Sequence, residues 1–294
     1  MRILTLKSLL RGFFSIVVLS LILTAPFPAT AVSAETGLLW KLEAPSGKVS
    51  YLFGTMHSDD PRINDFSPAV LQALQDSEAF MMETLPPSDP SIYFMQNETL
   101  RDLLNPKELE QVLKLADFHA MHTDAAMRMK PWLLAMVFDL PKPQTPHAQD
   151  VQLFSKAQDM SKEILGLEDT EEHFGMLDSF SREDQLTMLR AVLKRSQKDK
   201  QRDFETLLKA YLAGDTAKIA MLDDKLTGSM LPKELWTRMR TKLLDERNER
   251  MAERIQAEAG DGSVFVAVGA SHLAGKGGLI ERLRSAGYQV SAVK

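Results

Sequence analysis

The 294-residue chain contains no cysteine. This absence excludes a disulfide framework, a thiolate nucleophile, a metal site with Cys ligands and a lipid anchor attached through a cysteine. The fold must therefore draw its stability from its core and not from covalent crosslinks. Any metal ion that the chain binds must be held by histidine, carboxylate or water ligands.

The first 34 residues have the pattern of a secretory signal peptide. Three basic residues lie within the first eleven positions, Phe13 to Ala25 form an apolar stretch, and Val32-Ser33-Ala34 offers small residues for cleavage. Two prolines follow the apolar stretch before it reaches the length of a membrane span; an uncleaved anchor is the alternative. We therefore expect residues 1–34 to be removed and the protein to be periplasmic or secreted, without membrane attachment after cleavage.

The sequence also has no excess of basic over acidic residues. When the three basic residues of the predicted leader are taken from the 35 Lys and Arg, 32 remain against 40 Asp and Glu, a net charge of −8. This balance does not indicate a nucleic-acid partner. Residues 35–294 contain no low-complexity linker and are long enough for one large domain with a substantial core.

Two common signatures of binding and catalysis are missing as well. Gly275, Gly277 and Gly278 lack the spacing of a dinucleotide-binding loop, and no Lys-Ser or Lys-Thr pair follows them as in a phosphate-binding loop. Ser58 and Ser271 adjoin histidines, but neither lies in the Gly-x-Ser-x-Gly turn of a serine hydrolase. Nucleotide binding and serine-triad chemistry are therefore disfavoured.

The chain does contain a repeated motif near its two ends. Val49-Ser-Tyr-Leu-Phe-Gly-Thr-Met-His57 and Val264-Phe-Val-Ala-Val-Gly-Ala-Ser-His272 each run as an apolar strand to a glycine and reach a histidine three residues later. With 15 Gly and 6 His in the chain, random placement gives about 0.3 matches to Gly-x-x-His. Both histidines are expected beyond the carboxyl ends of strands, where α/β sheets bind ligands. The alternative is that each histidine only caps its own loop through a backbone hydrogen bond.

Two further strand candidates end on a carboxylate. They are Ala79-Phe-Met-Met-Glu83, which two prolines follow closely, and Glu163-Ile-Leu-Gly-Leu-Glu168. Glu83 is either a solvated terminal residue or a metal ligand or general base. With His57 and His272, these carboxylates suit a divalent Zn, Mn, Co or Fe ion, among which the sequence does not choose. An ion held in this way can activate water, and a second carboxylate can accept the proton. These residues therefore predict metal-assisted hydrolysis.

A long predicted helix before the second histidine carries one charge at an apolar position. Its stripe of residues at intervals of four consists of Leu235, Met239, Leu243, Arg247, Met251 and Ile255. If Arg247 is buried it must be paired, because an unpaired buried charge costs several kcal/mol. Arg247 therefore forms either a structural ion pair with an acidic neighbour or an anion or oxyanion contact in the site.

The strand and helix patterns together predict the α/β (α+β) class. The two N-terminal strands read as a hairpin around Ala44-Pro-Ser-Gly-Lys48, and the strands at 264–270 and 289–293 read as a βαβ unit with a helix from 278 to 285. Helical periodicity prevails within about residues 100–260. The expected fold is a central mixed sheet from the N- and C-terminal parts with a large helical middle or cap.

Several short segments recur in an order that is typical of one protein family. They are Leu39-Trp-Lys, Tyr51-Leu-Phe-Gly-Thr-Met-His57, Lys130-Pro-Trp132, Gly166-Leu-Glu168, Arg247-Asn248 with Met251, Val268-Gly-Ala-Ser-His-Leu-Ala-Gly275 and Gly287-Tyr288. Together they resemble the TraB/GumN family over nearly the whole of residues 35–294. That family is similar to the Tiki metalloproteases and, more remotely, to the erythromycin-esterase and ChaN-like proteins.

The resemblance implies a divalent-metal peptidase site made of the two Gly-x-x-His motifs and a glutamate. His57, His272 and Glu83 match these places, while Arg247 and Glu168 match further positions of the family pattern. The sequence and the resemblance together predict a metal-dependent hydrolase with a peptide or small-molecule substrate. In this hypothesis Glu83, Arg247 and Glu168 serve catalysis, with Glu83 also a metal ligand.

The chain departs from the family pattern at two places, since His173 stands where the family has Gln and Ser271 stands where Gly is common. Two other functions stay open. One is a non-catalytic binding protein for a metal complex such as haem or for a small signal peptide. The other is a regulatory or structural partner without a metal, because family membership alone does not establish an activity.

Overall fold

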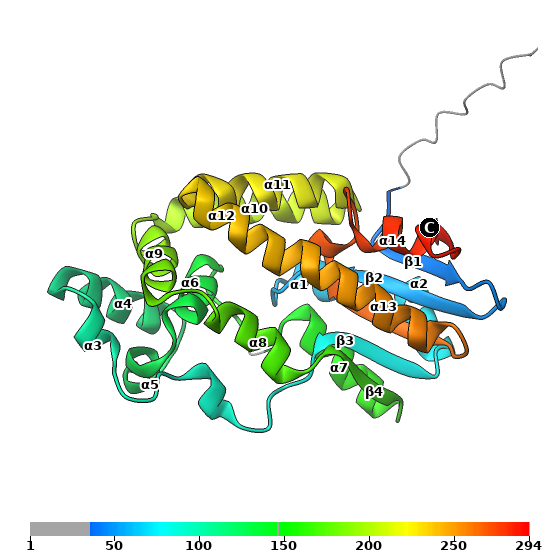
Figure 1. Cartoon of the computed structure of the whole chain (residues 1–294), viewed down its shortest axis with the longest axis horizontal. Helices are drawn as coiled ribbons and strands as arrows, with labels where there is room; N and C mark the ends of the chain where they lie inside the picture. Colours follow the sequence, from blue (N-terminus) through cyan, green and yellow to red (C-terminus); the bar gives the residue numbers. More distant parts are fainter. Residues whose placement is uncertain (1–35, 146, 294) are drawn as a thin grey trace, which may run out of the picture. The chain divides into compact units, whose positions relative to one another are not determined.

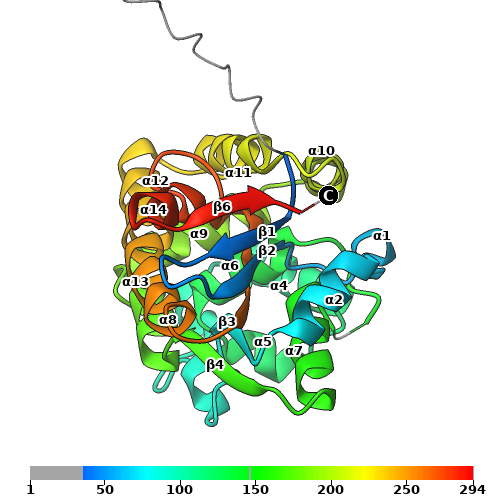
Figure 2. The ribbon, with the colours of Figure 1, turned by 90° about the vertical axis from the view of Figure 1, so that its right-hand side faces the viewer.

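A six-stranded mixed sheet forms the centre of this computed structural model, which describes residues 36–145 and 147–293 (Figures 1 and 2). The strand order is β4-β3-β5-β2-β1-β6, in which β4, β3, β5 and β2 are parallel and β1 is antiparallel to both of its neighbours. The predicted α/β class is confirmed. The strands are β1 (Leu39–Glu43), β2 (Val49–Thr55), β3 (Ala79–Thr84), β4 (Glu163–Glu168), β5 (Val264–Gly269) and β6 (Gln289–Ala292).

The predicted hairpin joins β1 to β2. The Ala44 N–H donates to the Lys48 carbonyl at 2.9 Å, and Gly47 turns the chain with a φ of +85°, a conformation that glycine adopts without strain. The C-terminal βαβ unit differs from the simplest expectation. β5 leads through α14 (Leu279–Ser285) to β6, but β2 and β1 lie between them, and β6 is hydrogen-bonded to β1 instead.

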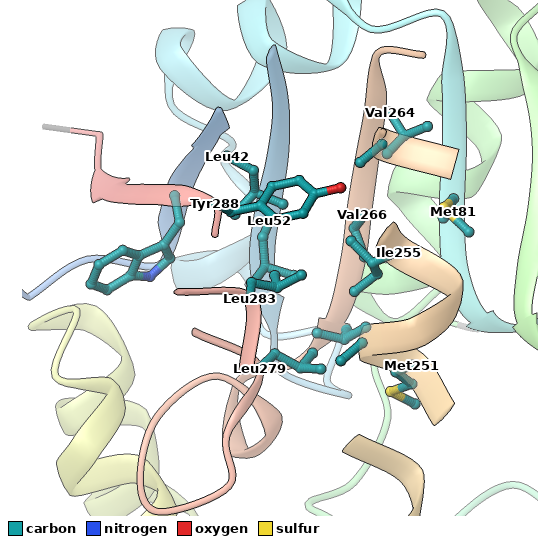
Figure 3. Packing of buried hydrophobic residues seen from close by; sticks show 14 of the residues in the cluster. Leu42, Leu52, Met81, Met251, Ile255, Val264, Val266, Leu279, Leu283 and Tyr288 are labelled. Carbon is teal, nitrogen blue, oxygen red and sulfur yellow. The ribbon is translucent and has the colours of Figure 1, made fainter. Parts of the chain in front are cut away.

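Side chains of β5 alternate between two buried faces of the sheet. Val264, Val266 and Val268 enter a core with α14 and with α13 (Arg247–Ala259), which Figure 3 shows. Phe265 and Ala267 enter a second core on the other face, with α2 (Pro68–Asp76) and α7 (Gln149–Asp159). A strand that is covered on both faces needs apolar residues at every position. This explains the uninterrupted apolar run before the second histidine motif.

The helical middle of the chain has a core of its own. Trp132, Phe138 and Leu189 are among its buried side chains. The helical periodicity predicted within about residues 100–260 is confirmed, and the strand Glu163–Glu168 interrupts it as expected. The elements are α1 (Pro61–Asn64), η1 (Pro90–Tyr93), α3 (Leu100–Leu103), α4 (Pro106–Phe118), α5 (Thr123–Arg128), α6 (Pro131–Asp139), α8 (Thr170–Asp178), α9 (Arg182–Leu193), α10 (Gln197–Leu212), α11 (Thr216–Met230) and α12 (Lys233–Arg240).

The long helix with the apolar stripe consists of α12, a π-helical segment η2 (Thr241–Glu246) and α13. Leu235 and Met239 belong to the core of the helical middle, whereas Met251 and Ile255 belong to the sheet core. Each step of four residues turns about 40° beyond a full turn of an α-helix. The two ends of the stripe therefore face different cores, and Arg247 lies where the helix passes from one to the other.

Within the part of the chain that the structure describes, no helix is both long enough and apolar enough to cross a membrane. The predicted leader, residues 1–34, lies outside the described residues. Its removal and the periplasmic or secreted location therefore stay predictions.

Candidate active site

The parallel strands bring four of the predicted residues to one edge of the sheet. β2 pairs with β5 as far as Thr55 opposite Gly269, and β3 pairs with β4 as far as Thr84 opposite Glu168. Neighbouring parallel strands end at the same edge, where their following loops meet. At this edge His57 follows β2, Glu83 lies near the end of β3, Glu168 ends β4, and His272 closes the 3-10 turn η3 (Ala270–His272) after β5.

The glycines of the two Gly-x-x-His motifs lie at close contacts within this edge. A Cβ atom on Gly54 would lie 2.5 Å from Leu273 Cδ1 and 3.2 Å from Ala270 Cα. A Cβ atom on Gly269 would lie 3.2 Å from Glu83 Oε1. Both positions need glycine because a backbone segment or the site carboxylate approaches closely. The first motif thus packs directly against the loop that carries the second.

Arg247 links the two carboxylates. Its Nη2 donates to Glu83 Oε2 at 2.6 Å and to Glu168 Oε2 at 2.8 Å, and its Nε donates to Glu168 Oε1 at 3.0 Å. The Arg247 side chain is buried and also lines the cavity described below. The structural ion pair expected as one alternative is therefore present, and it lies within the site itself. Two neighbouring carboxylates raise the pKa of the Arg247 guanidinium further, although burial opposes this.

Glu83 is held as an ionised carboxylate. Besides Arg247, the Gly269 N–H donates to Glu83 Oε1 at 2.7 Å. Burial alone would raise the pKa of Glu83, but the positive charge of Arg247 and these hydrogen bonds hold it well below its usual range. Glu83 is therefore available as an electron-pair donor and not as an acid.

Glu168 is saturated by cationic and hydrogen-bonding neighbours. In addition to Arg247, it accepts a hydrogen bond at 3.3 Å from Arg250 and contacts His173 Nδ1 at 2.9 Å. Burial would raise the pKa of Glu168, but His173 and Arg247 lower it to about 2. Glu168 is buried and is not among the residues that line the cavity. This arrangement lets Glu168 orient Arg247, a different geometry from the open ligand or base that its strand-end position suggested.

His272 has a fixed orientation and tautomer. Its Nδ1 lies 2.6 Å from Asn248 Oδ1, and Asn248 Nδ2 donates to the Gly277 carbonyl at 3.1 Å. Because Asn248 Oδ1 can only accept, Nδ1 of His272 carries the proton, and the lone pair on Nε2 faces Arg247 Nη1. Burial, partly offset by Glu83, lowers the pKa of His272 to about 4. Nε2 lies 4.0 Å from Glu83 Oε1 and 3.4 Å from Arg247 Nη1.

His57 has a different environment. Its side chain is exposed, and its Nδ1 lies 3.2 Å from Asp150 Oδ1. Asp150 raises the pKa of His57 above the ordinary histidine value, against the opposing effect of desolvation. Among the described residues, no three His, Asp or Glu side chains lie close enough together to hold one metal ion. The structure thus brings Glu83 and His272 together and turns His57 toward Asp150.

Two partners in the site were not assigned roles from sequence. In the sequence Asn248 appears only beside Arg247 in the family pattern, and its contact with His272 depends on the fold. His173 was noted only as a departure from the family pattern. A signal was present in both cases, because Asn248 follows Arg247 directly and His173 lies one turn into the helix after Glu168.

A cavity of about 490 Å³ opens above Glu83, Arg247 and His272. His57 also lines it. The walls come from the helical middle of the chain and are mostly apolar. Examples of the wall residues are Trp132, Met188, Phe204, Leu226, Trp236 and Met239. A cavity with apolar walls and a few convergent polar groups on one side is typical of a small-molecule or peptide site.

Comparison with known proteins identifies the family of the chain. A family model described as the TraB/PrgY/gumN family matches residues 38–292. The relative named Metalloprotease TIKI2, from Xenopus tropicalis, is 27% identical over 303 aligned positions, which cover 82% of this chain and 57% of that protein. Metalloprotease TIKI1 from Homo sapiens is 24% identical over 304 aligned positions, with 82% and 59% covered.

A third relative, an uncharacterized protein of Treponema pallidum, is 23% identical over 241 aligned positions, covering 72% of this chain and 71% of that protein. The chain therefore spans about 57% to 59% of the length of the two metalloprotease relatives described above. Their names describe those longer proteins.

Proposed function

The chain belongs to the TraB/PrgY/gumN family, and from this premise we propose that it is a divalent-metal-dependent hydrolase that cleaves peptides. The relatives named metalloproteases support the reaction class. The observation that carries the proposal is the facing pair of Glu83 and His272 beside an apolar cavity. One is an ionised carboxylate, and the other is a neutral imidazole whose Nε2 lone pair faces Arg247.

The donor atoms of this pair fit a shared cation. Ligand bonds from His nitrogen or carboxylate oxygen to zinc are about 2.0–2.2 Å long, so two donors of a tetrahedral ion lie about 3.4 Å apart. The 4.0 Å between His272 Nε2 and Glu83 Oε1 needs to shorten only slightly for both atoms to bind one ion. Metal-binding histidines usually donate their second ring N–H to a fixed acceptor, which sets the tautomer and the ring plane. Asn248 does this for His272. Mn, Co, Zn and Fe all remain compatible with such donors.

His57 is the third ligand in this proposal. It follows β2, the neighbour of β5, and lines the same cavity as Glu83 and His272. Its exposed side chain contacts Asp150. A ligand role for His57 therefore requires its side chain to turn from Asp150 toward Glu83 and His272.

When bound, a divalent cation supplies a Lewis acid that polarises a peptide carbonyl and lowers the pKa of water. The protein residues have separate tasks. Glu83, kept ionised by Arg247, serves as ligand or as proton acceptor. Arg247 offers a positive charge to an oxyanion at the cavity wall. Glu168 acts as a positioning residue because it holds the guanidinium, and His173 supports Glu168 through the contact between its Nδ1 and Glu168 Oε2.

The proposal includes a periplasmic or secreted location, which is supported by the pattern of residues 1–34. Amino-terminal sequencing of the protein purified from its native compartment tests it. Cleavage after Ala34 is expected, and a mature protein that begins at Met1 would contradict the location.

The activity test uses purified protein stripped with a chelator and reloaded separately with Mn, Co and Zn. We expect cleavage of apolar peptides, followed by mass spectrometry, to require one of these ions and to be lost in Glu83→Gln and His272→Ala. The matched control is His122→Ala, since His122 is exposed and does not line the cavity. Cleavage that survives metal removal, or that His272→Ala leaves unchanged, would sink the proposal.

The non-catalytic alternative is favoured by one observation, the guanidinium of Arg247 only 3.4 Å from His272 Nε2. A cation already beside the lone pair suits a binding pocket for an anionic or metal-containing ligand. The same experiment separates the two functions. Metal uptake that depends on His272, without cleavage of any peptide, would favour binding over hydrolysis.

A further inference from the structure

Three carboxylates on the helical wall of the cavity have no role in the proposed chemistry, and among the described residues Asp223 is the one of them without a basic partner. Asp223 lies on α11, which packs against the η3 turn that carries Ser271 and His272. The Asp223 carboxyl contacts the Ser271 side chain and lines the cavity. A negative group from the helical wall thus faces the space beside the proposed reaction centre.

Asp223 differs from the other acidic residues nearby in lacking a counter-charge. The ion pairs of those residues are Glu83–Arg247, Asp139–Arg195, Asp203–Arg195 and Asp224–Arg240. Within residues 36–145 and 147–293, Asp223 forms no ion pair with a basic side chain. Burial raises the pKa of its carboxyl, because apolar surroundings disfavour a charge without a partner.

We propose that Asp223 binds the ammonium group of a peptide substrate. This inference rests on the proposed hydrolase function and adds a substrate class to it, a peptide with a positive group next to apolar residues. An incoming ammonium group supplies the counter-charge that Asp223 lacks and forms a charge-assisted hydrogen bond. Asp223 is partly buried within a cavity whose walls are mostly apolar, so this interaction is stronger than at the protein surface.

The ammonium group has two sources in peptides, the α-amino terminus and the lysine side chain. The α-amino nitrogen is separated from the first carbonyl carbon by a single carbon atom. An α-amino group held by Asp223 next to Ser271 and His272 would therefore place the first peptide bond at the reaction centre. A lysine side chain would place a bond farther along the chain there. The first source corresponds to removal of amino-terminal residues and the second to cleavage near lysine.

Three probe peptides separate these sources: leucyl-leucyl-alanine amide, its Nα-acetyl form, and Nα-acetyl-lysyl-leucyl-alanine amide. Binding is measured by calorimetry on the metal-free protein, so that turnover is not required. We expect the free amine to bind about 10- to 100-fold more tightly than the acetyl form. Asp223→Asn removes this preference, whereas Asp224→Asn, the matched control on the same helix, retains it.

Each binding result either identifies the source of the ammonium group or contradicts the proposal. Preference for the free α-amine assigns Asp223 to the peptide terminus, and equally tight binding of the acetylated lysyl peptide assigns it to lysine side chains. Equal binding of all three peptides to the unmodified protein overturns the proposal without reference to any variant, as does a preference that persists in Asp223→Asn. An amine preference without metal-dependent cleavage would leave Asp223 as a binding residue and overturn only the hydrolase. Metal-dependent cleavage without an amine preference would support the hydrolase and overturn only the role of Asp223.

Discussion

The two Gly-x-x-His segments are alike in sequence and differ in environment. Both follow an apolar strand, and the strands are direct neighbours in the sheet. His272 is buried, has its Nδ1 proton fixed by Asn248 and has a pKa lowered to about 4. His57 is exposed, contacts Asp150 and has a raised pKa. The same motif thus produces a neutral, oriented donor in one place and a more basic, solvent-facing imidazole in the other.

This difference follows from what covers each loop. α13 brings Arg247 and Asn248 against the second motif, whereas the first motif lies beside the amino-terminal end of α7 with Asp150. A motif therefore determines which side chain leaves the sheet edge, and the neighbouring helix determines its charge state.

The largest effect on stability is expected from removing the positive charge of Arg247. Arg247→Met leaves Glu168 buried without its main partner, and breaking a buried ion pair from one side costs about 3–5 kcal/mol. We expect this loss in the free energy of unfolding, measured by urea denaturation. Arg250→Met is the control, since Arg250 is partly exposed and contacts Glu168 only at 3.3 Å. Equal losses in both variants would contradict the central role of Arg247.

The two histidines should give opposite dependences of stability on pH in the metal-free protein. The unfolded chain protonates His272 at its ordinary pKa of 6.5, but the folded chain does so only at about 4. The folded state therefore loses stability as pH falls from about 6.5 to 4, by up to about 3 kcal/mol. His272→Gln should flatten this decline, as measured by urea unfolding across that pH range.

His57 should give the opposite dependence of stability on pH. Its folded-state pKa is raised, so the stabilisation from protonated His57 is present below pH 6.5 and is lost as pH rises through the folded-state value. The effect is small because the side chain is exposed. His57→Gln should change only this shallow slope. If both histidine variants show the same pH profile as the unmodified protein, the two environments do not differ in the way described.

The partner of each histidine provides a third comparison, in metal affinity. Loss of a residue that orients a metal-binding histidine typically costs about 10- to 100-fold in affinity. We expect this reduction for Asn248→Ala, measured by competition with a coloured chelator. Asp150→Asn should cost less than about tenfold, since His57 is solvent-facing and less constrained. A larger loss from Asp150→Asn would reverse the ranking of the two motifs.

The smallest effect concerns the contact between the motifs. Gly54→Ala places a methyl group against Leu273 and Ala270, and overpacking of this kind costs about 1–2 kcal/mol when a flexible side chain can move. Thermal unfolding monitored by circular dichroism measures the loss. Gly175→Ala is the control, because a Cβ there meets nothing within 4 Å and α8 gains a better helix former. A stabilised Gly54→Ala variant would show that the motifs do not pack as described.

Local pattern was sufficient for most of the fold. Every strand was predicted to within two residues, since buried strands are short apolar runs that end at glycine or a charge. The position of Arg247 in its stripe was equally readable, because a charge among apolar residues must find a partner. The order of the strands in the sheet could not be predicted from local pattern. The separation of β5 from β6 by two strands depends on pairing between segments that are distant in sequence.

Sequence alone determined which residues leave the sheet edge, because strand periodicity and the position of a breaking glycine are local properties of the chain. Tertiary structure alone decided how those residues are used. The orientation of His57, the support of Glu168 by His173 and the contact of Asp223 with Ser271 all depend on which helix covers which loop. Charge, burial and hydrogen bonding act through space, so residues far apart in sequence set them together.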